Sequence, residues 1–374
     1  MTLDRASVQS RLDRVRAYMR AAPLDALVVT HLTNVQYLTG FSGTAGALVL
    51  LPRACLLVVD FRYVTAARAV TEPLDGLVTV STFDTSYDEA LIQILLRERS
   101  ARVAIEGVYL PVGRFNALAS GLAAQSPLPV PPAESAPILV PTERMVERAR
   151  IIKDAAEVAT LREAGRRLAR VARDVPALVE EGRTEQAIAE DIERALRTAG
   201  FSRPAFETIV ASGPNGALPH ARPTMRPVQK GEATVLDFGG VYDGYCVDLT
   251  RTVQLGPVSA AIQRLYAAVA EAQDAAIRAV RPGEMASVVD RAARSVLERH
   301  GLGEAFGHGT GHGLGLEVHE EPRIGRAIPR LPDERLEPGM VFTIEPGAYI
   351  AGLGGVRIED DVLVTETGCE VLTR

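Results

Sequence analysis

The chain has 374 residues, of which 47% are hydrophobic and 24% are charged, and its formal net charge is −6 at pH 7. This length exceeds what one hydrophobic core usually serves, so we expect two domains, and the composition is that of a globular protein. The acidic balance argues against nucleic acid or an anionic membrane surface as a partner.

The cysteines and the N-terminus predict a cytoplasmic protein. Cys55, Cys246 and Cys369 lie far apart without a C-x-x-C pair, which favours free thiols in a reducing compartment over a disulfide framework. Residues 1–20 carry charges throughout and lack the apolar core of a signal peptide. Their apolar side chains recur at helical spacing, which predicts an amphipathic helix. No uncharged apolar run approaches the 18 residues of a membrane helix.

The first third of the chain alternates short apolar runs with a helical pattern. The runs predict buried strands at residues 25–30, 46–51, 54–61 and 77–83. An amphipathic helix is predicted at residues 86–99. This alternation is typical of a small α/β domain with a partly parallel sheet.

A proline-rich stretch follows, with six prolines in residues 126–145. So much proline excludes a helix or a central strand. We therefore place the domain boundary near residue 140, which gives domains at residues 1–140 and 141–374.

The second domain is predicted to be α+β. Helical patterns cover residues 153–179 and 184–200, and strand-rich residues 206–255 follow them. Two further helices are predicted at residues 258–280 and 284–300, with strands to the end. The helix at residues 184–200 should begin at Thr184, with Gly200 following it as its C-cap.

A hairpin pattern at residues 234–255 carries two acids, Asp237 and Asp248. If the turn is Tyr242–Asp243 the two acids face each other, and if it is Asp243–Gly244 they are diagonal neighbours on one face. A longer loop or a bulge would separate them, and solvent-facing acids remain an alternative. Buried together, two carboxylates need a compensating cation.

Residues 339–365 show a second hairpin pattern that carries two acids. Two strand patterns joined by a glycine-rich loop each end their apolar run in an acid, Glu345 and Glu359. Four inward-facing acids on two hairpins suggest a shared pair of divalent cations. Hard oxygen ligands suit Mn²⁺, Co²⁺, Mg²⁺ or Zn²⁺ and exclude a thiolate site.

The glycine-rich residues 307–322 contain His308, His312 and His319. The glycines do not match a phosphate-binding Walker pattern, because no Gly-Lys-Ser/Thr follows. A zinc-binding helix is also disfavoured, since each interior glycine would cost about 1 kcal/mol. We therefore expect extended or irregular backbone that presents these histidines as a metal ligand and proton-transfer groups.

Together and in this order, these motifs resemble those of the pita-bread metallopeptidases, in particular the Xaa-Pro branch with aminopeptidase P and prolidase. The resemblance is carried by the Asp237–Asp248 spacing, HGTGHGLGLEVHE, TIEPG and GVRIEDDVLVT. The first half is similar to the creatinase-type domain through NVQYLTGFSGTAG and VDFRY. The resemblance implies a creatinase-like α/β N-terminal domain followed by an α+β pita-bread catalytic domain.

The resemblance also implies a site, residue by residue. The implied metal ligands are Asp237, Asp248, His312, Glu345 and Glu359, with Asp248 and Glu359 bridging two metals. The further active-site residues that it implies are His220, His308, His319 and Arg357.

The implied reaction is hydrolysis of the bond between an N-terminal residue and a following proline, by a hydroxide that two divalent metal ions activate. Mn²⁺ is our first choice. Co²⁺ and Zn²⁺ are alternatives, because the same ligands accept all three ions. Glu345 is the expected proton carrier, and His319 and His220 are expected to stabilise the oxyanion. His308 would line a proline pocket. The expected partners are short peptides with proline second and another copy of the chain in a homodimer.

Three alternatives share this architecture in whole or in part. A metal-free amidinohydrolase of the creatinase type would need an eroded ligand set, as would a non-catalytic binding protein on the pita-bread scaffold. A methionine aminopeptidase would keep the ligands but lack the N-terminal domain. Dipeptidase and aminopeptidase activities stay open at this point.

Overall fold

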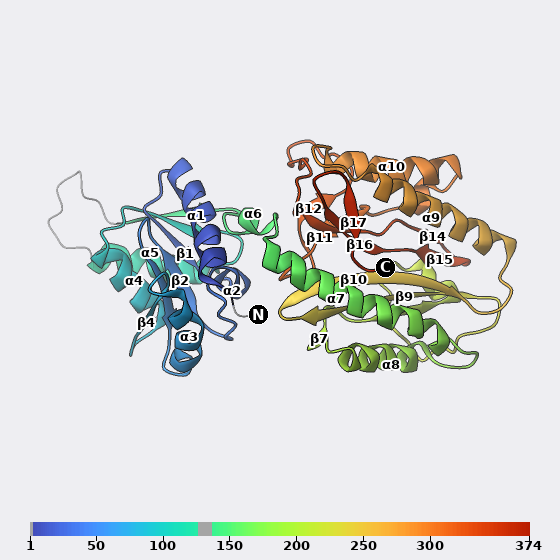
Figure 1. Ribbon diagram of the computed structural model, residues 1–374, viewed down its shortest axis with the longest axis horizontal. Coiled ribbons are helices and arrows are strands. Elements are labelled where there is room, and N and C mark those ends of the chain that lie inside the picture. Colours follow the sequence, from blue (N-terminus) through green and yellow to red (C-terminus); the bar gives the residue numbers. More distant parts are fainter. Residues whose placement is uncertain (1–2, 126–136) are drawn as a thin grey trace. The chain divides into compact units, whose positions relative to one another are not determined.

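The computed structural model describes residues 3–125 and 137–374 and divides the chain into two compact units, Met1–Arg150 and Ile151–Arg374 (Figure 1). Most of the proline-rich stretch lies outside the described residues, and the domain limit near residue 140 stays a prediction. None of the helices in the described ranges is long and apolar enough to cross a membrane.

The first unit is built on a six-stranded mixed sheet with the order β4-β3-β2-β1-β5-β6. Its strands are β1 (Ala26–Val29), β2 (Ala47–Leu50), β3 (Cys55–Val59), β4 (Thr79–Thr82), β5 (Arg102–Glu106) and β6 (Ile138–Thr142). Its helices are α1 (Arg5–Ala21), α2 (Leu32–Thr39), α3 (Val64–Thr71), α4 (Tyr87–Arg97), α5 (Val112–Gln125) and α6 (Glu147–Arg150), with a 3₁₀ turn η1 (Glu72–Leu74). The predicted partly parallel sheet is confirmed, because β1 pairs in parallel with β5, β5 with β6 and β3 with β4.

Two local details follow from the residue types. The side chains of α1 at helical spacing are at most 2% exposed, as predicted; they are Val8, Leu12, Val15 and Met19. Pro141 lies in β6 at the edge of the sheet, where its missing N–H leaves no interior ladder incomplete. The proline-rich stretch therefore still contributes a strand, but an edge strand.

The second unit has three sheets and four long helices. The helices are α7 (Ala155–Asp174), α8 (Glu185–Thr198), α9 (Ala260–Ala279) and α10 (Ala286–Arg299), with 3₁₀ turns η2 (Val175–Leu178), η3 (Gly213–Ala217) and η4 (Gly303–Ala305). The first strands are β7 (Arg203–Pro204), β8 (Ile209–Ser212), β9 (Ala233–Tyr242) and β10 (Tyr245–Gln254). The later strands are β11 (Gly311–Gly313), β12 (Glu320–Ile324), β13 (Val341–Ile344), β14 (Gly347–Ile350), β15 (Gly354–Arg357), β16 (Asp360–Val364) and β17 (Cys369–Val371).

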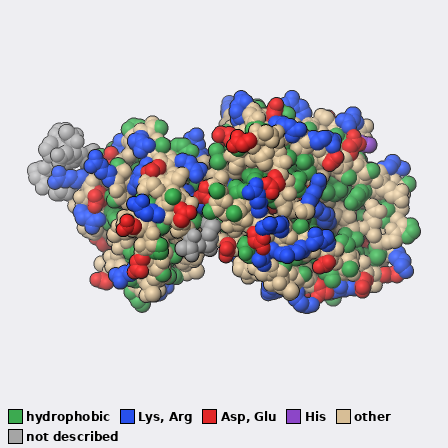
Figure 2. Space-filling model, in the orientation of Figure 1, with side chains coloured by type: hydrophobic (Ala, Val, Ile, Leu, Met, Phe, Trp, Pro, Cys, Tyr) green, Lys and Arg blue, Asp and Glu red, His purple; other side chains and the backbone are tan. Residues whose placement is uncertain are grey.

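Two helix pairs cover the strands of the second unit from opposite sides (Figure 1). The apolar faces of α7 and α8 pack with β9 and β10 in one buried cluster, and those of α9 and α10 pack with β13 to β16 in another. Thr184 caps α8, accepting a hydrogen bond from the Ala187 amide, and Gly200 follows the helix with a φ of 93°, as predicted. Figure 2 shows Lys and Arg side chains gathered over α7, where Arg162 and Arg166 form ion pairs with acids.

The hairpin β9–β10 takes the second of the predicted registers. Tyr242 pairs with Tyr245, so the turn is Asp243–Gly244. Both turn residues have positive φ, 48° and 88°, the conformation of the type I′ turn that suits a two-residue hairpin. Asp237 therefore pairs with Thr250 rather than with Asp248, and the two acids are diagonal neighbours on one face.

The C-terminal strands differ from the expectation of two continuous strands. Each pattern is divided, because β13 pairs with β16 in a five-stranded sheet of order β12-β11-β13-β16-β17, while β14 and β15 form a separate pair. Glu345 and Glu359 lie at the two interruptions. Their amides leave the ladder and donate to the carbonyls of Thr310 and Thr250, at 2.8 and 3.1 Å. The acids thus occupy the positions where the chain changes partners.

Candidate active site

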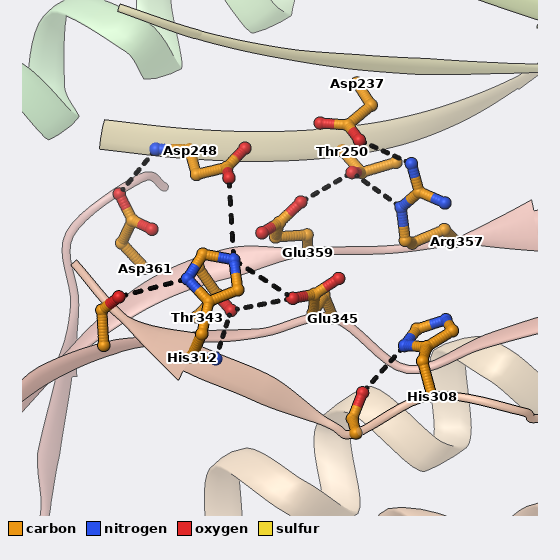
Figure 3. Close-up of polar contacts among 12 residues, drawn as sticks. Asp237, Asp248, Thr250, His308, His312, Thr343, Glu345, Arg357, Glu359 and Asp361 are labelled. Atoms are coloured by element: carbon orange, nitrogen blue, oxygen red, sulfur yellow. Dashed lines mark hydrogen bonds and ion pairs between the residues drawn. The ribbon is translucent and has the colours of Figure 1, made fainter. Parts of the chain in front are cut away.

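All the residues that the sequence predicts for the site line one cavity of about 530 Å³ in the second unit. They are Asp237, Asp248, His312, Glu345, Glu359, His220, His308, His319 and Arg357. Figure 3 shows the acids and His312 pointing toward one another from separate segments of the chain. The hairpin, the glycine-rich segment and the two C-terminal interruptions therefore meet at one place.

His312 points its free ring nitrogen at the acids. Its Nδ1 lies 3.1 Å from the carbonyl of Gly313, and since a carbonyl only accepts, Nδ1 carries the ring proton. Nε2 is then the unprotonated nitrogen, 3.4 Å from Glu345 Oε1 and 3.9 Å from Asp248 Oδ2. This is the tautomer in which an imidazole coordinates a metal through Nε2.

A second set of side chains orients the acids from behind. The Arg357 guanidinium donates to Asp237 at 2.5 Å and through Nε to the Thr250 hydroxyl at 3.2 Å. Thr250 in turn donates to Glu359 Oε2 at 2.6 Å, and Thr343 donates to Glu345 Oε1 at 3.1 Å (Figure 3). Each of these acids therefore has one oxygen fixed by a donor.

Without a cation, the electrostatics of the acid cluster are unfavourable. Burial raises the pKa of Asp248 and Glu359 well above the usual values, and neighbouring acids raise it further, Glu359 acting first on Asp248 and Glu345 first on Glu359. Burial also raises the pKa of Glu345. Like charges at such short range and away from water oppose ionisation. The cluster therefore needs positive charge to ionise near neutral pH.

The unpaired atoms of the cluster fit a cation. Asp237 Oδ1, Asp248 Oδ1 and Glu359 Oε1 are buried without a hydrogen-bond partner. Ligand atoms of Asp248, His312 and Glu359 lie within 4.8 Å of one another. Buried carboxylate oxygens beside an unprotonated imidazole nitrogen form a donor set that suits divalent ions with nitrogen and oxygen preference.

Three further histidines surround the cluster. The His308 ring lies with Nε2 2.9 Å from the Tyr349 hydroxyl, and the His319 ring packs edge-on against His312 with centroids 4.3 Å apart. Burial lowers the pKa of both His308 and His319, which favours their neutral forms. His220 is exposed on the loop after η3 and lines the same cavity.

The glycines around His312 allow close packing of strands rather than phosphate binding. A Cβ on Gly311 would lie 1.9 Å from the Thr343 carbonyl oxygen, and one on Gly313 would lie 2.1 Å from that of Glu321. Any side chain would therefore push β11 away from its neighbours. The strand is extended, as predicted, and presents His312 from an irregular pairing with β12 that contains a register shift.

Comparison with known proteins identifies the family. The family model of metallopeptidase family M24 matches residues 159–366, and that of the creatinase/prolidase N-terminal domain matches residues 11–152. The chain belongs to metallopeptidase family M24. It is an M24 enzyme with a creatinase-type N-terminal domain and a pita-bread catalytic domain, as the sequence resemblance implied.

Its similarity to individual M24 proteins extends over both units. An Xaa-Pro dipeptidase of Pyrococcus furiosus is 32% identical over 98% of each chain. The solved Xaa-Pro dipeptidase of Bacillus anthracis has a TM-score of 0.90 at 31% identity and covers 98% of each chain. An Asp260Ala aminopeptidase P of Escherichia coli has a TM-score of 0.81 at 26% identity, covering 100% of this chain and 96% of the other.

Sequence reasoning missed several polar residues of this M24 site, and four of them contact predicted site residues. They are Thr250, Thr343, Tyr349 and Asp361. A simple signal existed for both threonines, since each lies two residues from a predicted acid and alternation along a strand places it on the same face. Asp361 accepts from the Asp248 amide at 3.0 Å, and Tyr349 contacts His308; neither contact follows from spacing along the chain.

Proposed function

We propose that this M24 metallopeptidase hydrolyses the bond between an N-terminal residue and a following proline. The observation that carries the proposal is the buried acid cluster, whose unpaired oxygens and raised pKa values call for divalent cations. The full-length similarity to Xaa-Pro dipeptidases supports the choice of substrate. The cavity of about 530 Å³ has room for a short peptide.

We assign the metal ligands to the residues that the resemblance implies. They are Asp237, Asp248, His312, Glu345 and Glu359. When bound there, a pair of divalent ions supplies Lewis acidity and lowers the pKa of a coordinated water. Mn²⁺ is our first choice, with Co²⁺ or Zn²⁺ as alternatives. Arg357 holds Asp237 in place, because its guanidinium forms an ion pair with this carboxylate and both side chains are largely buried.

The remaining residues bind and move protons. Glu345 lies between the ligand His312 and the Thr343 hydroxyl, and we assign it the proton that the attacking water loses. His319 and His220 line the cavity, and we assign them as hydrogen-bond donors to the oxygen of the scissile carbonyl. The leaving nitrogen of proline belongs to a tertiary amide, so it must gain a proton before the bond breaks.

His308 is proposed to line the pocket for the proline ring. Its ring is held between the Gly309 carbonyl, the Tyr349 hydroxyl and an edge-on contact with Phe306, whose centroid is 5.1 Å away. A side chain held from three sides keeps its shape, and shape is what a pocket for a rigid ring requires. We also propose a cytoplasmic homodimer, from the composition and from the prevalence of symmetric dimers.

The test compares metal-depleted and restored protein on three peptides. Protein treated with a chelator and dialysed should lose hydrolysis of Ala-Pro and Ala-Pro-Ala, and should regain it with Mn²⁺ or Co²⁺. Ala-Ala, which lacks the proline ring, serves as the matched control and should be cleaved poorly. Cleavage that survives verified metal removal would contradict the proposal, and the ratio of the two proline peptides separates dipeptidase from aminopeptidase activity.

A further inference from the structure

A buried ion pair on α10 lies behind the glycine-rich segment that carries His308. Asp290 is 1% exposed and Arg294 is 7% exposed. The guanidinium donates to both oxygens of this carboxylate, through Nε at 3.0 Å and Nη2 at 2.9 Å. Neither residue lines the cavity of the acid cluster.

The pair binds three alternate residues of the segment 306–310. Arg294 Nη1 donates to the Phe306 carbonyl at 3.0 Å, and Nη2 donates to the His308 carbonyl at 2.9 Å. The Thr310 hydroxyl donates to Asp290 Oδ1 at 2.9 Å. The guanidinium carbon also lies 4.2 Å from the centroid of the Phe306 ring. One buried pair thus fastens two backbone carbonyls, of Phe306 and His308, and the Thr310 side chain to α10.

The ends of this segment are packed, since Phe306 is 2% exposed and Thr310 is fully buried, but His308 and Gly309 between them border open space. Besides the cavity of the acid cluster, there is a second cavity of about 1020 Å³ that Arg294 and Phe306 line. His308 and Gly309 line both cavities. A glycine beside open space has more backbone freedom than other residues, so Gly309 alone does not fix the position of His308. Hydrogen bonds to a rigid helix can remove that freedom.

The orientation of the His308 ring depends on where its backbone is held. Nδ1 lies 2.7 Å from the Gly309 carbonyl, so Nδ1 carries the proton and Nε2 accepts. Arg357 donates to the Tyr349 oxygen at 2.9 Å, so the Tyr349 proton is directed at His308 Nε2. A shift of the segment by about 1 Å would break the contact between His308 Nε2 and the Tyr349 hydroxyl, and shifts of that size can cost about 100-fold in rate.

We propose that Arg294, together with Asp290, is a positioning residue for His308. The pair fixes the backbone of the segment so that the ring keeps one tautomer and one orientation toward the cavity. The proposal rests on the proposed function for its kinetic consequence. Its structural consequence, a single orientation of His308, does not depend on which peptide the enzyme cleaves.

The kinetic test replaces Arg294 by Lys and compares it with a matched variant. Arg294→Lys keeps the charge beside Asp290 but loses the fork that reaches two carbonyls. We expect kcat/KM for Ala-Pro to fall about 10- to 100-fold with bound Mn²⁺ unchanged. The control is Arg299→Lys on the same helix, whose exposed ion pair with Glu271 is 2.8 Å long and which should match the wild type. Wild-type kcat/KM in Arg294→Lys would overturn the proposal.

A double-variant cycle separates positioning from general stability. In a His308→Ala background, Arg294→Lys should change kcat/KM less than about twofold, because the residue it positions is gone. Additive losses would overturn the proposal. If Arg294→Lys does not fold, Thr310→Val removes only the hydroxyl bond to Asp290 and should give a smaller loss with the same non-additivity.

Nitrogen NMR of the histidine rings gives a readout without substrate. In Zn²⁺-loaded wild type, His308 should show a single tautomer with the proton on Nδ1, and Arg294→Lys should show a mixture. An unchanged His308 signal in the variant would overturn the proposal. If the wild type cleaves no Xaa-Pro peptide but the His308 signal still differs between the wild type and Arg294→Lys, the proposed function is wrong and the positioning role of Arg294 stands.

Discussion

At the scale of single residues, the site is defined by acids that are costly to bury without metal. Asp248 and Glu359 are 5% and 2% exposed, and each has one oxygen without a hydrogen-bond partner. By contrast, Glu185 is fully buried but accepts hydrogen bonds from Ser212, Asn215 and Thr224. The presence or absence of hydrogen-bond donors to every carboxylate oxygen therefore distinguishes a structural acid such as Glu185 from the proposed metal ligands.

The ligands and the catalytic histidines should respond differently to truncation. Glu359→Ala removes a proposed bridge between two cations, so metal content and peptide hydrolysis should both collapse. His319→Ala removes only a group aimed at the developing oxyanion, so metal content should persist while kcat falls about 10²- to 10³-fold. Metal analysis and one Ala-Pro assay on each variant measure both effects.

A thermal scan adds a control for this comparison. Added Mn²⁺ should raise the melting temperature of His319→Ala as it does that of the wild type, because the ion binds the native state. Glu359→Ala should lose most of this rise, whereas Glu366→Ala, at an exposed position nearby, should keep it. Loss of metal from His319→Ala would instead make His319 a ligand.

At the scale of elements, the sequence predicts more of the hairpin than of the C-terminal strands. The alternation and the turn residues restrict β9–β10 to a few registers, and two of them place Asp237 and Asp248 on one face. The interruptions at Glu345 and Glu359 could not be predicted in this way. They arise because β13 pairs with β16 and β14 pairs with β15, and these pairings depend on contacts outside each strand. Sequence patterns within each strand therefore cannot predict which strands pair at these interruptions.

Glycine substitutions test how tightly β11 must pack. Gly311→Ala places a Cβ 1.9 Å from the Thr343 carbonyl oxygen, so the strand must move and take His312 with it. We expect metal affinity to fall about 10- to 100-fold, as when the support of a ligand is lost. Gly307→Ala is the matched control, since nothing lies within 4 Å of its Cβ, and it should bind Mn²⁺ like the wild type. Equal metal affinity in both variants would refute this account of the glycines.

At the scale of the whole molecule, the acid cluster should set the pH dependence of stability in metal-free protein. Burial raises the pKa of Asp248, Glu345 and Glu359 above the unfolded values, so the folded chain binds more protons than the unfolded one. These acids therefore add stability below about pH 4 and lose it as the pH rises through their folded pKa values. A tenfold difference in proton affinity between the folded and unfolded chain changes the free energy of unfolding by about 1.4 kcal/mol.

Urea unfolding from pH 4.5 to 8 measures this effect. Metal-free wild type should lose stability across this range, and Asp248→Asn should lose less and be the more stable protein at pH 8. With saturating Mn²⁺ the wild-type trend should reverse, because the cation binds the deprotonated acids. A metal-free wild type and Asp248→Asn with parallel pH profiles would show that the cluster is not the cause.

The proposed metal centre also has a consequence for how preparations of this protein can be judged. Asp237 comes from a four-stranded sheet, His312 from a five-stranded sheet, and Glu359 from the gap between two strands of separate sheets. An unfolded or misregistered chain does not bring these groups together. The number of tightly bound metal ions per chain therefore measures the fraction of correctly folded catalytic units. It can be used to assess a refolded or mutated preparation before any peptide assay.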